Sequence, residues 1–249
     1  MGFNFKFTHK DANKLLLGLI LFEVFLSLVF ALDIVLETSW QGPRIFDLDG
    51  EATIPAWFSS LQLFLIGVLF LFSRNWPQIN RVFAPNVLLL VGCGFVFLSM
   101  DEAASFHEGI TYNLDHIDWI PKFKGGHGIW IPIYLIMALV LVAASVRTIK
   151  SVFQVYSRQA TIMLSGALVF LAGAVGLEII GYQYVRGSEY SHLYEIEVLL
   201  EELLEMVGAS IILYGTVLCA LSKPPQAMGR VLRNGAAAKK LELAEPNGR

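Results

Sequence analysis

Charged residues are scarce in this sequence, and their scarcity excludes an ordinary soluble protein. They make up 16% of the 249 residues, whereas 55% of the residues are hydrophobic and the mean hydropathy is +0.61. A soluble domain carries about a quarter charged residues and cannot hide so much apolar surface from water. We therefore expect an integral membrane protein, whose length suits a single helical bundle.

Cysteine and the familiar metal-binding motifs are also nearly absent. The two cysteines, Cys93 and Cys219, lie in apolar runs, which is typical of small buried side chains rather than of a disulfide or a metal site. The sequence contains no His-Glu-x-x-His and no His-x-x-x-His motif, and no fingerprint of a phosphate-binding or dinucleotide-binding loop. No catalytic residue can be assigned, and the sequence leaves open whether the protein is an enzyme.

Long hydrophobic runs are what the sequence has instead. A helix needs about 20 apolar residues to cross about 30 Å of hydrocarbon. Six stretches qualify, although the fourth is short and the last qualifies only if its acidic start enters the membrane. All five tryptophans lie near the ends of these stretches, as in an interfacial aromatic belt. The runs predict an all-α bundle of six transmembrane helices over residues 15–36, 55–73, 82–101, 129–146, 160–180 and 201–221, in one domain (1–222) that precedes a mobile basic tail (223–249).

The distribution of lysine and arginine predicts the orientation of the bundle. Fourteen of the 18 basic residues lie in the N-terminal segment, the second and fourth loops and the tail, which six spans place on one side. The other side has only Arg44, Lys122, Lys124 and Arg186. Because basic loops stay in the cytoplasm, we expect both termini there, in a plasma membrane or a bacterial inner membrane.

Acidic residues show the opposite distribution. Seventeen of the 21 lie on the predicted outer side or at the outer ends of helices. Counting 20 residues from the cytoplasmic end of each helix brings Asp33, Asp101, Glu178 and Glu202 to one level near the outer boundary of the hydrocarbon. Because ionised residues are costly inside a membrane, protons, partner cations, water or a bound metal ion must offset this layer of carboxylates.

The end of the third helix contributes several acids at informative spacing. Asp101, Ser105 and Glu108 lie at positions i, i+4 and i+7, which share one face of a continuous helix. Glu102 lies beside them, while His107 needs a bend or a loop to join them.

The sixth helix contributes a second acidic face. Glu197, Glu201 and Glu205 form one stripe, and Glu202 pairs with Glu205 at i, i+3. Residues 208–221 supply only about 21 Å of helix, so Glu205 and Glu202 must enter the membrane. Carboxylates on facing helices with one imidazole can bind a divalent cation. The predicted metal ligands are Asp101, Glu102, His107, Glu108, Glu178, Glu201, Glu202 and Glu205.

Glu23 is an isolated acid within the first helix. An intramembrane acid is a candidate for proton transfer. The alternative is a protonated glutamate that hydrogen-bonds to a neighbour such as Gln62 or Ser165. The sequence does not decide between them.

Two further features could complete the acidic site. The segment 47–51 alternates acids around a glycine before the second helix, which indicates an acidic turn, or more loosely a calcium loop, that folds over the carboxylate layer. The fifth helix is rich in small residues, and Ala172 and Gly176 are spaced to allow close approach of another helix. That approach would bring Glu178 towards the other acids.

Together these observations predict an outward-facing intramembrane site that binds a divalent metal ion of unknown identity, as in a metal-dependent membrane enzyme. The expected partners are the lipid bilayer and a lipid or small-molecule substrate, with no role for nucleic acid. Two alternatives stay open: a transporter coupled to protons or cations, and a non-catalytic subunit that binds another membrane protein. Against transport, the inner halves of the third, fifth and sixth helices have almost no polar residues.

Overall fold

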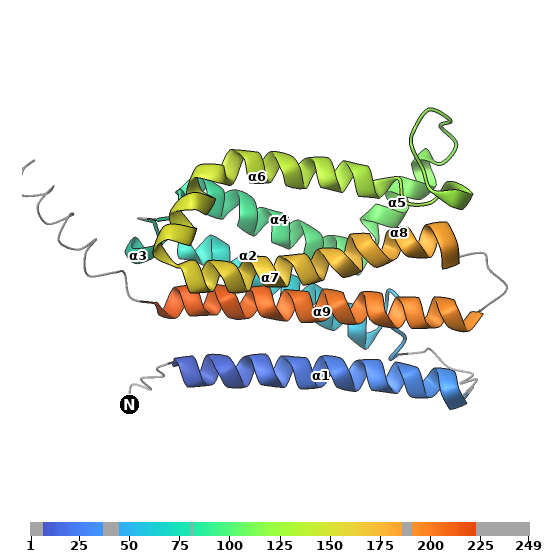
Figure 1. Ribbon diagram of the computed structural model, residues 1–249, viewed down its shortest axis with the longest axis horizontal. Helices are drawn as coiled ribbons and strands as arrows, with labels where there is room; N and C mark the ends of the chain where they lie inside the picture. Colours follow the sequence, from blue (N-terminus) through green and yellow to red (C-terminus); the bar gives the residue numbers. More distant parts are fainter. Residues whose placement is uncertain (1–6, 37–44, 81, 186–190, 223–249) are drawn as a thin grey trace, which may run out of the picture.

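Successive long helices run in opposite directions along the bundle in the computed structural model (Figure 1). The structure describes residues 7–36, 45–80, 82–185 and 191–222. Six of the described helices are long and apolar enough to cross a membrane. The prediction of an all-α bundle with six helices that could span a membrane is therefore confirmed for the described residues. The predicted mobile tail (223–249) lies outside the described residues.

The connections between spans differ in length, from the single residue Tyr156 between α6 and α7 to residues 105–129 between α4 and α6. The spans are α1 (His9–Leu36), α2 (Ile54–Ser73), α4 (Pro85–Ala104), α6 (Trp130–Val155), a fifth span built from α7 (Ser157–Leu171), η2 (Ala172–Leu177), α8 (Glu178–Ile180) and η3 (Gly181–Val185), and α9 (Ser191–Leu221). The connections contain α3 (Pro77–Asn80), α5 (Phe106–Leu114) and η1 (Lys124–Gly126).

Two of the predicted boundaries are wrong because hydropathy locates only the embedded part of a helix. The fourth span was expected to be short, but α6 has 26 residues. The sixth was expected to begin near Glu201, but α9 begins at Ser191 and has 31 residues. A helix satisfies its backbone hydrogen bonds internally, so it continues past the apolar window into polar residues.

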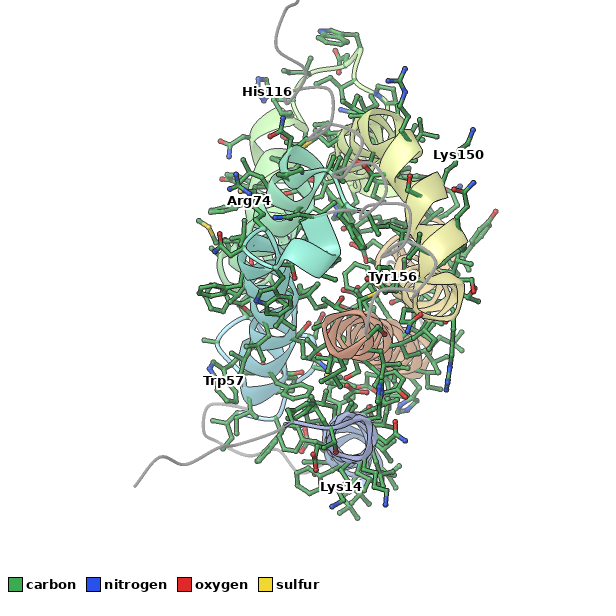
Figure 2. All side chains as sticks on the ribbon, turned by 90° about the vertical axis from the view of Figure 1, so that its left-hand side faces the viewer. Lys14, Trp57, Arg74, His116, Lys150 and Tyr156 are labelled. Carbon is green, nitrogen blue, oxygen red and sulfur yellow. The ribbon has the colours of Figure 1, made fainter. Side chains whose placement is uncertain are left out.

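Two close helix pairs form the bundle, α2 with α4 and α7 with α9. Viewed along the bundle (Figure 2), α9 lies between α1 and the rest of the protein, and it also packs against α2. By contrast, α6 packs only lightly against α4, α5 and α7. The bundle thus has a central helix, α9, and a loosely held peripheral helix, α6.

The helices α7 and α9 lie so close together that no side chain would fit at the glycines of their contact. A Cβ atom placed on Gly208 would lie 2.4 Å from the backbone nitrogen of Phe170. One placed on Gly166 would lie 2.8 Å from the backbone oxygen of Gly208. Small residues let membrane helices approach until their backbones touch, and these glycines set the spacing between the two helices.

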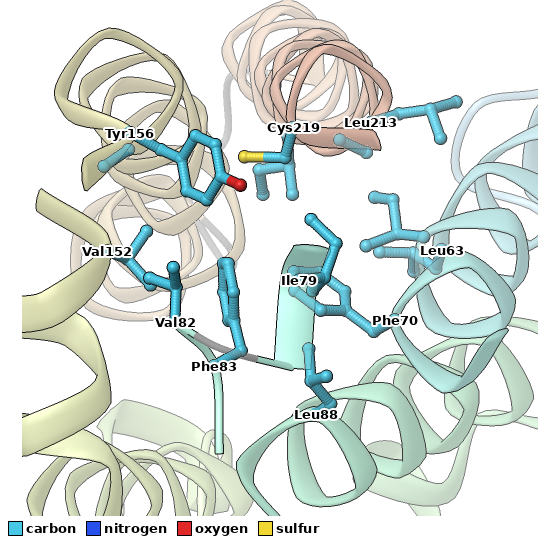
Figure 3. Packing of buried hydrophobic residues seen from close by; sticks show 14 residues of the cluster. Leu63, Phe70, Ile79, Val82, Phe83, Leu88, Val152, Tyr156, Leu213 and Cys219 are labelled. Atoms are coloured by element: carbon cyan, nitrogen blue, oxygen red, sulfur yellow. The ribbon is translucent and has the colours of Figure 1, made fainter. Parts of the chain in front are cut away.

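An apolar cluster closes the end of the bundle at which α1 begins and α9 ends, called the terminal end below (Figures 1 and 3). The connection between α2 and α4 turns inward there and buries Ile79, Val82 and Phe83. These side chains pack in one cluster with Tyr156, which links α6 to α7, and with Cys219 of α9. We call these five residues the terminal plug.

Both cysteines are free thiols. Cys219 is buried as predicted, but Cys93 is exposed on α4. The prediction for Cys93 is wrong because apolar runs in a membrane helix include positions that face lipid as well as positions that face the core.

Candidate functional site

A cavity of about 540 Å³ lies among α2, α4, α6, α9 and the fifth span, beneath the acidic connection that precedes α2. His107 lines it, but no lysine or arginine of the described residues does. All eight predicted metal ligands line the cavity, whereas Asp33 of α1 does not. The nine acidic residues of its wall are Asp49, Glu51, Asp101, Glu102, Glu108, Glu178, Glu201, Glu202 and Glu205.

Three glutamates converge beside this cavity, and two of them, Glu178 and Glu201, line it. Glu178 of α8 and Glu197 and Glu201 of α9 each offer one carboxylate oxygen, and the three oxygens lie within 4.8 Å of one another. All three side chains are buried. The carboxyl groups of Glu178 and Glu201 hydrogen-bond to each other, which requires a proton between them because ionised carboxylates only accept hydrogen bonds. These three residues are the glutamate triad.

Glycines of the fifth span make room for the triad. Glu197 and Glu201 lie one turn apart on α9 and so share a face. A Cβ atom on Gly181 would lie 2.2 Å from Oε1 of Glu197, and one on Gly173 would lie 2.7 Å from the backbone oxygen of Glu201. At these glycines, the backbone of the fifth span therefore contacts the acidic face of α9 directly.

The fifth span is not a regular α-helix around Glu178. The segments η2 and η3 on either side of α8 are π-helical, a rare conformation that occurs mostly as single turns and often at functional sites. A π turn holds more residues than an α turn, so it changes which residues face a neighbour. This explains why the predicted contact at Gly176 is wrong: a Cβ there would meet only the backbone of its own span, at Leu171, 3.8 Å away.

A second group of polar side chains forms where α4 ends. Asp101 accepts hydrogen bonds from the backbone nitrogen of His107 (2.8 Å) and the hydroxyl of Tyr134 (3.0 Å) at Oδ1, and its Oδ2 lies 3.2 Å from His107 Nδ1. The burial of His107 lowers its pKa, but the hydrogen bond and the charge of Asp101 outweigh burial and raise that pKa above the usual value. The charge of Asp101 thus favours the protonated form of the imidazole.

The backbone of Ser105 creates this arrangement. Its φ of 48° and ψ of 45° are left-handed, and they end α4 at Ala104 before α5 begins at Phe106. The bend that the sequence analysis required for His107 is therefore present. The single face predicted for Asp101, Ser105 and Glu108 is wrong, because that spacing shares a face only in an unbroken helix.

Trp130 adds an unpartnered donor to the cavity wall. Its ring centroid lies 5.2 Å from that of His107 and 5.3 Å from that of Tyr134. The side chain is only 8% exposed, and its Nε1 has no hydrogen-bond partner among the described residues. Sequence analysis placed Trp130 in the interfacial belt, so its role in the cavity was missed.

The acidic connection before α2 covers the carboxylate layer, as expected from the sequence. Asp49 and Glu51 line the cavity, and the hydroxyl of Tyr194 on α9 donates to Asp49 at 2.8 Å. Leu48 is buried beside them. Whether the connection binds calcium stays a prediction.

Comparison with known proteins identifies a family but no activity. Residues 15–221 match a family described as a domain of unknown function (DUF8692). The chain belongs to this family. No curated protein and no solved structure matches it. The matched region contains all six spans except the first residues of α1, and it includes every residue of the cavity wall, so the argument for a function rests on the site itself.

Glu23 lies within the family match but away from the cavity. Its Oε1 accepts hydrogen bonds from Nε2 of Gln62 (2.8 Å) and Oγ of Ser210 (2.6 Å). The expected neighbour Gln62 is thus confirmed. Ser165 is wrong, because it is exposed and its hydroxyl donates to the backbone of Ile162 instead. This network joins α1, α2 and α9 and leaves the cavity to the other acids.

Proposed function

We propose that the protein binds a divalent cation at the glutamate triad, in an intramembrane site that opens to the outer side of the cell membrane. The observation that carries the proposal is the convergence of three buried carboxylates within 4.8 Å. Like charges at this spacing repel strongly in a medium of low dielectric constant. A divalent cation between them turns that repulsion into coordination.

The kind of donor narrows the choice of ion. The triad offers only carboxylate oxygens, which suit hard cations such as Mg²⁺, Mn²⁺ and Ca²⁺. Three protein oxygens leave coordination positions open for water or a substrate oxygen. A cation held in this way can polarise a substrate or activate water, which supports a metal-dependent membrane enzyme. The pair Asp101–His107 then supplies an acid–base group on the same cavity wall.

Charge at the terminal end supports the outward orientation. Lys14, Arg74 and Lys150 belong to the end of the bundle that faces the viewer in Figure 2. Basic residues mark the cytoplasmic side of a membrane protein. The cavity, with its acidic wall, lies towards the opposite end, so it faces out of the cell.

One second candidate has a specific observation in its favour. Glu178 and Glu201 can share a proton in a hydrogen bond between their carboxyl groups, so protonation could neutralise the triad in place of a metal. The terminal plug argues against transport of those protons through the bundle, because its five side chains are buried in an apolar cluster at the terminal end. Proton binding therefore competes with the metal at the same site.

Manganese binding separates these two candidates. Purified protein is freed of metal with a chelator, and free Mn²⁺ is measured by electron paramagnetic resonance as it is titrated in. We expect one saturable Mn²⁺ site per wild-type chain and affinity at least about tenfold weaker in Glu178→Gln and Glu201→Gln. Affinity should rise with pH, because metal binding must displace the protons of its ligands.

Glu195→Gln is the matched control, because it makes the same change on α9 at a partly exposed acid that pairs with His192 instead. It should bind Mn²⁺ as the wild type does. Folded wild-type protein without a saturable Mn²⁺ site would leave the triad to protons and end the metal proposal. Equal losses in Glu195→Gln and Glu201→Gln would place the ion elsewhere.

A further inference from the structure

We propose that the cavity binds a single-chain amphiphile from the bilayer, with its hydrocarbon chain between α4, α6 and α7 and its uncharged or cationic head group against the acidic wall. This inference goes beyond the cation site, because it rests on the shape and the lining of the whole cavity. A volume of about 540 Å³ lies in the range of cavities that hold small-molecule ligands.

The half of the cavity away from the acids is apolar. We call it the apolar arm and define it by six lining residues: Leu90 and Gly94 of α4, Ala138 and Leu141 of α6, and Phe170 and Leu171 of α7. A polar ligand would lose its hydration there without compensation. A hydrocarbon chain would match the lining, and the acids mark where its head group stops.

The apolar arm opens sideways into the membrane. Leu90, Met137 and Leu171 line the cavity and are also exposed on the protein surface, at 49%, 52% and 44%. They come from three different spans, so the opening lies between helices at the depth of the hydrocarbon. Because α6 packs lightly against its neighbours, a chain can enter between the helices without crossing water.

The polar end of the cavity defines the head group. Its lining includes His107, Trp130 and Tyr134, whose rings pack edge to face around Trp130. Nine acids line the cavity, and no lysine or arginine of the described chain lines it with them. An anionic head group would meet like charge, whereas a neutral or cationic one would not.

Native mass spectrometry of detergent-purified protein tests this proposal with 1-monooleoylglycerol and oleate, which share one chain length and differ in head-group charge. A Cβ on Gly94 would meet no atom nearer than the flexible side chain of Leu141, at 4.0 Å, so Gly94→Leu begins from an open position and extends into the apolar arm. Gly18 of α1 has no atom within 4 Å, and Gly18→Leu is the matched control. Thermal unfolding of each variant establishes that it is folded.

We expect one bound 1-monooleoylglycerol in the wild type and in Gly18→Leu, at least about tenfold weaker binding in Gly94→Leu, and weak binding of oleate throughout. Equal binding by the two glycine variants, or oleate bound as well as 1-monooleoylglycerol, overturns the proposal. Mn²⁺ titration of Gly94→Leu keeps the two proposals apart, because filling the apolar arm leaves the triad intact.

Discussion

The two oxygens of Glu23 have different surroundings. Oε1 accepts from Gln62 and Ser210, whereas Oε2 is buried without a hydrogen-bond partner among the described residues. An ionised carboxylate with one bare oxygen is costly inside a membrane protein. We infer that Oε2 carries a proton and that Glu23 is a structural link between three helices rather than a step in a proton path.

Glu23→Gln and Glu23→Ala test this inference. Glutamine has the shape of a protonated glutamate and keeps the acceptor, so we expect a loss of less than about 1 kcal/mol in the free energy of unfolding. Alanine leaves the hydroxyl of Ser210 buried without its acceptor and removes one of the acceptors of Gln62, at a cost of about 1–3 kcal/mol. Unfolding in mixed detergent micelles, followed by circular dichroism, measures both. A larger loss for glutamine than for alanine would mean that Glu23 is ionised.

At the scale of residues, the acids of the site could be predicted from the sequence, but the uncharged residues beside them could not. Helical spacing placed Glu201 and Glu205 on one stripe with Glu197, although Glu197 was not counted among the metal ligands. Tyr134 and Trp130 carried no signal, because an aromatic residue near a helix end is typical of the membrane interface. Their roles depend on how α6 lies against α4, which a single sequence does not contain.

At the scale of elements, the regular period of the α-helix predicts which residues share a face only where the helix is unbroken. It predicted which acids share a face on α9, where the helix is unbroken. It failed at Ser105, where a left-handed residue ends α4, and in the fifth span, where η2 and η3 are π-helical. Such local departures depend on tertiary packing, and no residue in either segment demands them.

The contact between α7 and α9 yields a prediction about Gly208. In Gly208→Ala the new Cβ would lie 2.4 Å from the backbone nitrogen of Phe170. Backbone atoms cannot move aside as a flexible side chain can, so we expect a loss of about 1–3 kcal/mol in the free energy of unfolding. The same mixed-micelle unfolding measures it.

Gly18→Ala is the control for Gly208→Ala, because the position on α1 has no neighbour within 4 Å. Alanine favours a helix over glycine by about 1 kcal/mol, so this change should be neutral or slightly stabilising. If Gly208→Ala behaves like Gly18→Ala, the two helices are further apart than their glycines indicate.

At the scale of the whole molecule, hydropathy and charge predicted the number of helices, but not their arrangement. Six apolar runs were sufficient to predict six spans. The pairing of α7 with α9, the central place of α9 and the loose packing of α6 come from side-chain and backbone fit between segments far apart in sequence. The cavity exists only through that arrangement, so its apolar arm could not be predicted.

The orientation of the bundle is open to direct measurement. Single cysteines are introduced as His116→Cys, in the connection after α5, and Lys150→Cys, towards the terminal end of α6, with Cys93 and Cys219 replaced by serine. A membrane-impermeant maleimide should label the first variant in intact cells. The second should react only after the membrane is permeabilised. The reverse pattern would place both termini outside and turn the cavity towards the cytoplasm.

The terminal plug determines which compartment sets the occupancy of the acids by protons and cations. In the proposed orientation, the buried side chains of the plug lie between the acids and the cytosol, so the acids equilibrate mainly with the outer compartment. Their occupancy follows the acidity and the mineral content of the surroundings of the cell, whatever the metabolic state within it. The electrical potential across the membrane then falls mainly over the half of the bundle that contains the plug. It therefore has little effect on the binding of protons and cations in the cavity.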